Sequence, residues 1–162
     1  MFKQDANRIL TLVSEAGKID GRKKFQKIVF IIQAKGGNIP ERFKYHYYGP
    51  FSSDLQMEID DLVDHKVLIE DNSGSYFSYK LSPQASDFDV DDDILKMKDL
   101  IQYLNKIDAQ KLELISTIYF LKQEGCKEES LIQKKIKILK PHLIDLLPDS
   151  IKKTKEIDVM VE

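Results

Sequence analysis

The sequence predicts a mainly α-helical protein with a small antiparallel β-sheet, organised as a winged helix-turn-helix-like domain followed by C-terminal helices. Apolar residues recur at helical spacing in three early segments and in several later ones, and two apolar runs flank a turn-rich stretch between them. The 162 residues are 42% hydrophobic and 32% charged, which is the composition of a chain that buries a core without cross-links. The single cysteine, Cys126, excludes an internal disulfide and a cysteine-based zinc site.

The first two helices are predicted from apolar periodicity and from the glycines that end them. Residues 4–15 carry one apolar face, and Gly17 suits the end of that helix. Asp20 is then expected to cap a second helix over residues 22–35, which Gly36 terminates. Four cations crowd the first two turns of this second helix, where the helix dipole disfavours positive charge. The fold must tolerate these cations, or a partner must use them.

A short strand and a third helix follow. Alternation over residues 43–48 predicts the strand. The Gly49–Pro50 pair is expected to form the turn into a helix over residues 53–66, because glycine permits a positive φ and proline fixes the next φ. Either Ser53 or Ser52 is expected to cap this third helix at its N-terminus.

A β-hairpin completes the order of a winged helix. Apolar residues 67–69 and 76–81 flank a turn-forming stretch of polar residues and glycine. We therefore expect a winged-helix-like domain over residues 1–85 and an acidic linker over residues 86–93. Residues 94–162 are expected to form a helical segment that packs on the first domain or on the partner in a homodimer, because its many apolar positions need cover.

The C-terminal segment shows helical periodicity interrupted by two prolines. Asp108 is a suitable N-cap for its second helix, and Pro141 and Pro148 separate the later helices. The predicted helices span residues 94–106, 109–123, 129–140 and 150–158.

Two sequence runs carry a resemblance to a known family. The run KIDGRKKFQKIVFIIQ, followed after a gap by YHYYGPFSSDLQMEIDDLVDHKVLIE, resembles the YwgA-like family of winged-helix-like proteins from bacteria and archaea. The resemblance covers Lys18 to about Glu70, and more loosely the later run LELISTIYFLK. It implies a winged-helix-like fold and supplies no catalytic residues. The element Tyr48-Gly49-Pro50-Phe51-Ser52 is also similar to one in the Panacea and SocA-type antitoxin domains, which implies antitoxin-like roles.

The charge is distributed unevenly along the chain. Residues 1–56 carry ten Lys and Arg against five Asp and Glu, a net of +5. Residues 57–93 carry two against eleven, a net of −9, and residues 94–162 carry thirteen against eleven, a net of +2. Such asymmetry bears on the choice of partner more than on the fold.

The predicted third helix is rich in carboxylates, which argues against its use as a DNA-reading helix, because phosphates would repel them. We expect instead a non-enzymatic, antitoxin-like protein-interaction module that binds a basic partner protein such as a toxin. A charged solvent face that serves only solubility is the plainer alternative. The expected protein-binding residues are Asp54, Glu58, Asp61 and Asp64.

The second hypothesis is a winged-helix transcriptional regulator or nucleic-acid-binding protein that uses the basic second helix and the neighbouring tyrosines. Cations would contact phosphates, and tyrosines would stack on unpaired bases. The alternative is that the tyrosines pack on the core beside a solvated basic face. The residues expected to bind nucleic acid under this hypothesis are Arg22, Lys23, Lys24, Lys27, Arg42, Lys44 and Tyr48.

The sequence contains no pattern that predicts an enzyme. His46, His65 and His142 lie on different predicted elements, and no phosphate-binding, dinucleotide-binding or nucleophile-elbow motif is present. The run Asp87 to Asp93 lacks the central glycine of a calcium loop. We therefore expect no catalytic, cofactor or metal-binding residues. The N-terminal stretch lacks a signal-peptide core and no run has the length of a membrane span, so the expected location is the cytoplasm.

Overall fold

A computed structural model describes residues 2–85 and 87–161 of the chain. The first half contains α1 (Gln4–Ala16), β1 (Ile19–Asp20), α2 (Arg22–Ala34), β2 (Lys44–His46), β3 (Gly49–Phe51), α3 (Ser53–Asp64), β4 (Leu68–Asp71) and β5 (Ser78–Leu81). The second half contains α4 (Asp92–Leu95), α5 (Lys98–Asn105), α6 (Ala109–Gln123), α7 (Glu129–Leu139) and α8 (Leu147–Met160), with short 3-10 turns at Pro83–Ala85 and Pro141–Leu146. The predicted class, mainly α with a small antiparallel sheet, is confirmed.

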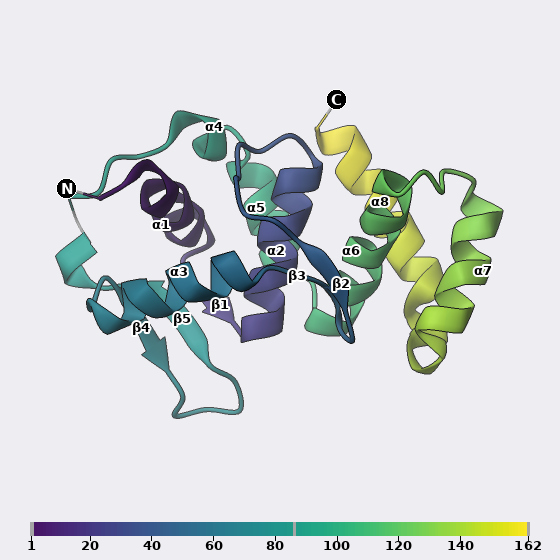
Figure 1. Cartoon of the computed structure of the whole chain (residues 1–162), viewed down its shortest axis with the longest axis horizontal. Coiled ribbons are helices and arrows are strands. Elements are labelled where there is room, and N and C mark those ends of the chain that lie inside the picture. The colour runs from purple at the N-terminus through teal and green to yellow at the C-terminus, as the bar shows by residue number, and fades with distance from the viewer. Residues whose placement is uncertain (1, 86, 162) are drawn as a thin grey trace.

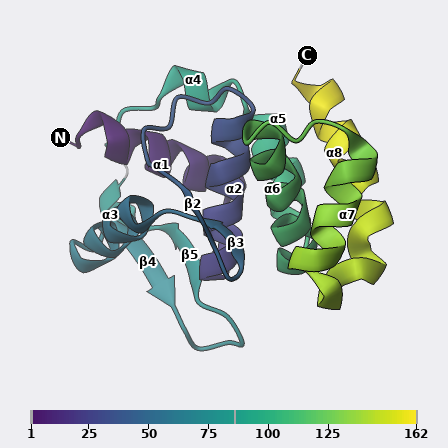
Figure 2. The same ribbon diagram turned by 45° about the vertical axis from the view of Figure 1, so that its right-hand side comes forward.

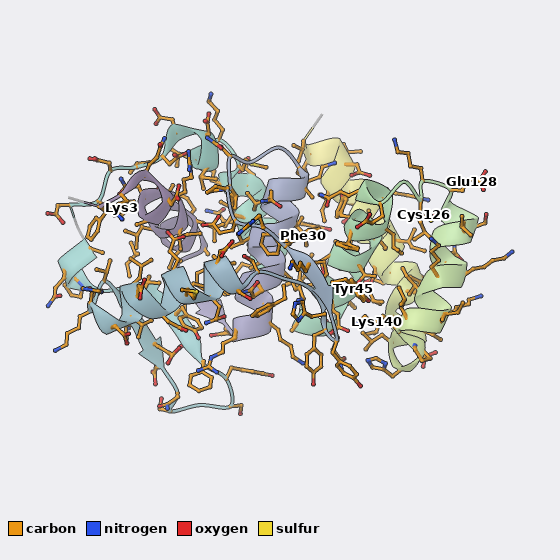
Figure 3. All side chains as sticks on the ribbon, viewed as in Figure 1. Lys3, Phe30, Tyr45, Cys126, Glu128 and Lys140 are labelled. Carbon is orange, nitrogen blue, oxygen red and sulfur yellow. The ribbon has the colours of Figure 1, made fainter. Side chains whose placement is uncertain are left out.

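Helix α2 is the centre of the structure. Figure 1 shows α1, α3 and the sheet on one side of α2, and α6, α7 and α8 on the other. The stretch from Phe25 to Ile32 is buried on every side, so its polar members, Gln26 and Lys27, are buried too. Phe30 lies in the middle of this core, where Figure 3 labels it. One continuous apolar cluster joins α1 and α2 to residues of α4, α5, α6 and α8.

The larger sheet has the strand order β1–β5–β4 and is antiparallel throughout. Ile19 pairs with Tyr79, and Asp20 pairs with Ser78. The expectation that Asp20 caps α2 is therefore wrong, because its backbone belongs to the sheet. Gly21 takes the N-cap position at φ 107° and donates its N–H to the carbonyl of Phe77 at 2.6 Å. A side chain at that position would be strained in this left-handed conformation.

The second sheet is the hairpin β2–β3, which is inserted between α2 and α3. The predicted turn at Gly49–Pro50 is wrong, because these residues form β3, where Pro50 pairs with Tyr45. Tyr47 and Tyr48 make the turn instead. Proline is tolerated in β3 because each strand of a two-stranded sheet has one free edge, where no backbone N–H is needed for pairing.

Ser52, the second candidate of the sequence prediction, caps α3. Its Oγ accepts the backbone N–H of Leu55 at 3.1 Å. The buried Gln26 side chain bonds the Ser52 backbone in both directions, donating to its carbonyl at 3.0 Å and accepting its N–H at 2.9 Å. The start of α3 is thereby fixed to the middle of α2.

The acidic segment expected as a linker lies against α1. The backbone N–H of Asp89 bonds the side chain of Asn7 at 3.2 Å, and that of Asp91 bonds Thr11 at 2.9 Å. The carboxylate of Asp91 also lies 3.5 Å from Arg8 and caps α4. Residues 87–93 are therefore anchored in place, while residue 86, at the predicted boundary, lies outside the described part of the chain.

The C-terminal helices follow the predicted spans with two differences. The helix expected over residues 94–106 is divided into α4 and α5, and α8 begins at Leu147 with Pro148 in its first turn. Asp108 caps α6, as predicted, by accepting the N–H of Lys111 at 2.9 Å. Figure 2 shows α6, α7 and α8 grouped at one end of the molecule, where a second apolar cluster holds them together.

Candidate functional site

Two hollows lie on either side of α3. The first, which we name the acidic groove, has a volume of about 420 Å³ and is lined by one cation, Lys3, and by Asp5, Ala6, Asp54, Met57, Glu58, Asp61 and Leu62. The second, which we name the aromatic cleft, has a volume of about 490 Å³. Its walls include Arg22, Lys23, Tyr47, Tyr48, Gln56 and Asp60.

Helical spacing places the acidic residues of the groove together. Asp54, Glu58 and Asp61 follow one another at intervals of four and three residues, which are the intervals that share a helix face. Asp5, from the first turn of α1, adds a fourth carboxyl group. Met57 lies among them with 66% of its surface exposed. The groove thus combines an exposed apolar side chain with several carboxyl groups.

Glu58 faces a second carboxyl group behind the groove. Burial, followed by a hydrogen bond with Glu41, raises the pKa of Glu58 to about 8. Glu41 is 6% exposed, and its buried Oε2 has no hydrogen-bond donor among the residues that the structure describes. At neutral pH Glu58 is therefore mostly protonated.

The four residues expected to bind a protein do not form one surface. Asp54, Glu58 and Asp61 line the acidic groove, while Asp64 is exposed outside it at the end of α3. Asp54 also has a cation nearby, since its Oδ2 lies 3.6 Å from Nε of the exposed Arg42. Because Glu58 is largely neutral at pH 7, the negative charge of these four residues comes mainly from Asp54, Asp61 and Asp64.

The aromatic cleft lies between the first turns of α2 and the turn of the β2–β3 hairpin. Tyr47 and Tyr48 meet edge to face, with ring centroids 4.9 Å apart. The ammonium of Lys23 lies 3.3 Å from the centroid of the Tyr48 ring, a close cation–π contact. Tyr47 is 78% exposed, so its ring is open to solvent at the mouth of the cleft.

Polar groups from two elements complete the cleft. On α3, Gln56 Nε2 donates to Asp60 Oδ1 at 3.0 Å. On α2, the guanidinium of Arg22 stacks 3.9 Å from the centre of the Phe77 ring and donates to the Tyr79 hydroxyl at 3.3 Å. These contacts, together with Glu70, whose Oε2 lies 3.9 Å from Nη2 of Arg22, hold Arg22 at the wall of the cleft while about half of its side chain stays exposed.

Buried charges hold the hairpin that carries the two tyrosines. Lys27 donates to the carbonyl of Pro50 at 2.7 Å, and burial lowers its pKa to about 8. Lys140 donates to the carbonyl of Tyr47 at 2.5 Å and forms an ion pair with Glu113 at 3.0 Å, where both side chains are buried. Figure 3 shows Lys140 beside Tyr45 of β2. The C-terminal helices thus fix the position of the cleft.

The residues expected to bind nucleic acid are divided by the structure. Arg22, Lys23, Lys27 and Tyr48 line the cleft, although the ammonium of Lys27 is buried under the hairpin. The three others lie elsewhere. Lys24 has Asp20 and Asp108 as its nearby charges, and burial lowers its pKa. Arg42 and Lys44 line a separate hollow.

Of the three histidines, His46 lines the aromatic cleft, whereas the other two and the cysteine occupy structural or peripheral positions. His46 packs against Phe51, and Nδ1 of His65 lies 2.8 Å from the Asp61 carbonyl. His142 is exposed, and Cys126 is buried in the second apolar cluster. Among residues 2–85 and 87–161, no group of three His, Cys, Asp or Glu side chains is arranged to hold a metal ion.

The sequence reasoning did not identify Glu41, Glu113 or Lys140 as important. Each is a charged residue in a segment with an ordinary polar pattern, and only the fold brings it to its partner. One weak signal exists for Lys140, which lies directly before Pro141 at the end of α7, where its side chain turns back into the structure. Within the described ranges, no helix is both long and apolar enough to cross a membrane.

Comparison with known proteins identifies a relative of this chain. No family model matches the chain. A protein of Bacillus subtilis (strain 168), which bears the name "Uncharacterized protein YwgA", is 33% identical to it over 135 residues, and the match covers 80% of each sequence.

Proposed function

We propose that this chain, which belongs to the YwgA-like family, is a non-enzymatic protein-interaction module that binds a basic partner protein in the acidic groove. The observation that carries the proposal is the exposed Met57, which lies between the carboxylates of Asp54 and Asp61. Exposed methionine is enriched at protein interfaces, and complementary charge around it raises the encounter rate and selects the partner.

The Glu41–Glu58 pair supports a cationic ligand for the groove. A lysine or arginine side chain placed beside Glu58 would favour its ionised form and release its proton. The partner's cation would then be hydrogen-bonded to a carboxylate that is shielded from water. Such charge-assisted hydrogen bonds are stronger than neutral ones.

An antitoxin-like role fits this chemistry. Toxins and other enzymes that act on nucleic acids present cationic surfaces, which an acidic groove can cover. Binding to the exposed Asp64 at the end of α3 would extend the contact beyond the groove. We propose a basic protein of this kind as the partner.

A winged-helix assignment for residues 1–85 is part of the proposal. It is supported by the element order α1, β1, α2, α3, β4, β5 and by the strand order β1–β5–β4. The β2–β3 hairpin takes the place of the tight turn between the second and third helices. The exposed carboxylates of α3 favour a protein partner over the DNA major groove for this helix.

A pull-down with a charge-matched control tests the proposal. The tagged wild-type chain is compared with two triple variants, each of which loses three carboxylates. The groove variant, Asp54→Asn/Asp61→Asn/Asp64→Asn, loses two carboxylates of the groove and the exposed Asp64 beside it. The control variant is Glu124→Gln/Glu128→Gln/Asp145→Asn, at three exposed positions in the C-terminal half.

We expect one near-stoichiometric basic protein to bind the wild type and the control variant after nuclease treatment, and to be lost from the groove variant. Equal recovery on the groove and control variants would show that the partner binds elsewhere. Loss of every bound protein on nuclease treatment would replace the proposal with the nucleic-acid hypothesis.

We retain nucleic-acid binding as a second proposal because one observation favours it. Lys23 and Tyr48 are in contact at the wall of the aromatic cleft, next to Arg22. A wide basic surface is less well supported, because the ammonium of Lys27 is buried and Arg42 lies close to Asp54.

A further inference from the structure

The aromatic cleft places three kinds of chemistry in one hollow. Cations lie on its α2 wall, an exposed aromatic ring lies on the hairpin, and a polar edge lies on α3. Its volume of about 490 Å³ is within the range of roughly 300–1,000 Å³ that small-molecule sites occupy. The cleft is therefore large enough for a ligand that satisfies all three walls.

We propose that the aromatic cleft binds one nucleotide, with its phosphate on Arg22 and Lys23, its base on Tyr47, and the edge of that base on Gln56 and Asp60. The inference narrows the second proposal above from a broad surface to a single nucleotide site. It shares no residue with the acidic groove, so either proposal can fail without the other.

The α2 wall suits a phosphate. Arg22 and Lys23 are the first two residues of α2, and the first turn contains no acidic residue. The helix dipole adds positive potential at this end. Stacking on Phe77 and Tyr48 fixes the direction of the two cations before a ligand arrives, which lowers the entropic cost of binding.

The hairpin supplies a surface on which a base can stack. The Tyr47 ring is 78% exposed and is held from one side by its edge-to-face contact with Tyr48. The Tyr47 carbonyl is fixed by the buried Lys140. Stacking of a base on an aromatic side chain contributes about 1–3 kcal/mol and needs no particular sequence.

The α3 wall predicts which base is preferred. Because Gln56 Nε2 donates to Asp60 Oδ1, Gln56 Oε1 and the second oxygen of Asp60 remain as acceptors. Guanine presents adjacent N–H donors on its Watson–Crick edge, whereas uracil presents one donor between two carbonyl acceptors. The wall therefore favours guanine over uracil. An acidic peptide would leave the exposed Tyr47 ring without a base to stack on it, which is why we choose a nucleotide as the ligand.

Calorimetric titration of the full chain tests the inference with four probes: GMP, UMP, inorganic phosphate and a single-stranded RNA hexamer with one guanosine among uridines. We expect GMP to bind about tenfold more tightly than UMP, and phosphate to bind more weakly than either. Similar affinities for GMP and the hexamer indicate a free nucleotide as the natural ligand. A hexamer that binds about tenfold more tightly indicates single-stranded nucleic acid.

Matched variants separate the cleft from a general charge effect. Lys23→Ala and Tyr47→Ala are each expected to weaken GMP binding about tenfold, and Asp60→Asn to abolish the preference for guanine. Lys24→Ala and Tyr76→Ala change the same residue types outside the cleft, so they should leave GMP affinity unchanged. GMP binding no tighter than phosphate, or equal losses in cleft and control variants, would overturn the inference.

Discussion

The carboxyl groups of Glu41 and Glu58, which come from different segments of the chain, meet behind the acidic groove, and their contact helps to raise the pKa of Glu58 to about 8. Such a pair is stable with one proton and unstable with none, because two adjacent buried carboxylates repel each other. The groove is therefore sensitive both to pH and to the arrival of a cation.

Replacing Glu58 with glutamine is expected to stabilise the protein at high pH. The pKa of Glu58 is raised from 4.5 to about 8, so the folded state holds the proton between these values and the unfolded state does not. Stability of the wild type must therefore fall as pH rises through this window. The Glu58→Gln variant does not lose stability in this way. It should be more stable than the wild type by about 2 kcal/mol at pH 8, and the two proteins should have similar stability below pH 4.5.

Urea denaturation between pH 4 and pH 8.5 measures this difference. Asp61→Asn, a change at an exposed carboxylate on the same helix, is the control and should leave the shape of the pH profile unchanged. A constant difference in stability between Glu58→Gln and the wild type across the whole pH range would contradict the raised pKa of Glu58.

Gly49→Ala is expected to destabilise the hairpin that forms one wall of the aromatic cleft. Gly49 has φ 96°, and a Cβ there would lie 3.3 Å from Thr117 Oγ1. We expect a loss of about 1–3 kcal/mol in the free energy of unfolding. Gly74→Ala is the control, because Gly74 has open space around it and no positive φ. Similar stability of the two variants would contradict the strained position of Gly49.

Replacing only one partner of the buried Lys140–Glu113 ion pair is expected to lower the stability of the protein strongly. Lys140→Met leaves Glu113 as an unpaired buried charge and removes the donor to the Tyr47 carbonyl. We expect a loss of about 3–5 kcal/mol, much of which the double change Lys140→Met/Glu113→Leu should recover. Lys155→Met, which breaks an exposed ion pair, should cost less than about 1 kcal/mol. Thermal and urea unfolding of the wild type, Lys140→Met, Glu113→Leu and the double variant, compared as a double-mutant cycle with Lys155→Met as the control, provide the measurement.

Helices were predictable here because apolar periodicity and caps act locally. The span of α6 and its cap at Asp108 could be read directly from the sequence. Strand β1 could not, because two residues carry no periodicity and Ile19–Asp20 becomes a strand only by pairing with β5. The prediction of a turn at Gly49–Pro50 was wrong for a related reason. Its residues favour a turn, but the pairing of β2 with β3 places them in a strand and moves the turn to the tyrosines.

The candidate sites were predictable in part. Helical spacing on α3 brings Asp54 and Asp61 to one side, and this follows from the sequence alone. The partnership of Glu58 with Glu41 depends on how segments distant in sequence pack, which no local pattern encodes. The same limit explains Lys27, which resembles its exposed neighbours in sequence but lies under the hairpin with its ammonium on Pro50.

The salt dependence of partner affinity tests the acidic groove most directly. The basic protein captured by the wild type is titrated into the wild type, the groove variant Asp54→Asn/Asp61→Asn/Asp64→Asn and the charge-matched control at low and high salt. We predict that the wild type and the control lose about tenfold in affinity on going to high salt, whereas the groove variant binds weakly at both. Equal affinity and equal salt dependence for all three proteins would contradict binding at the groove.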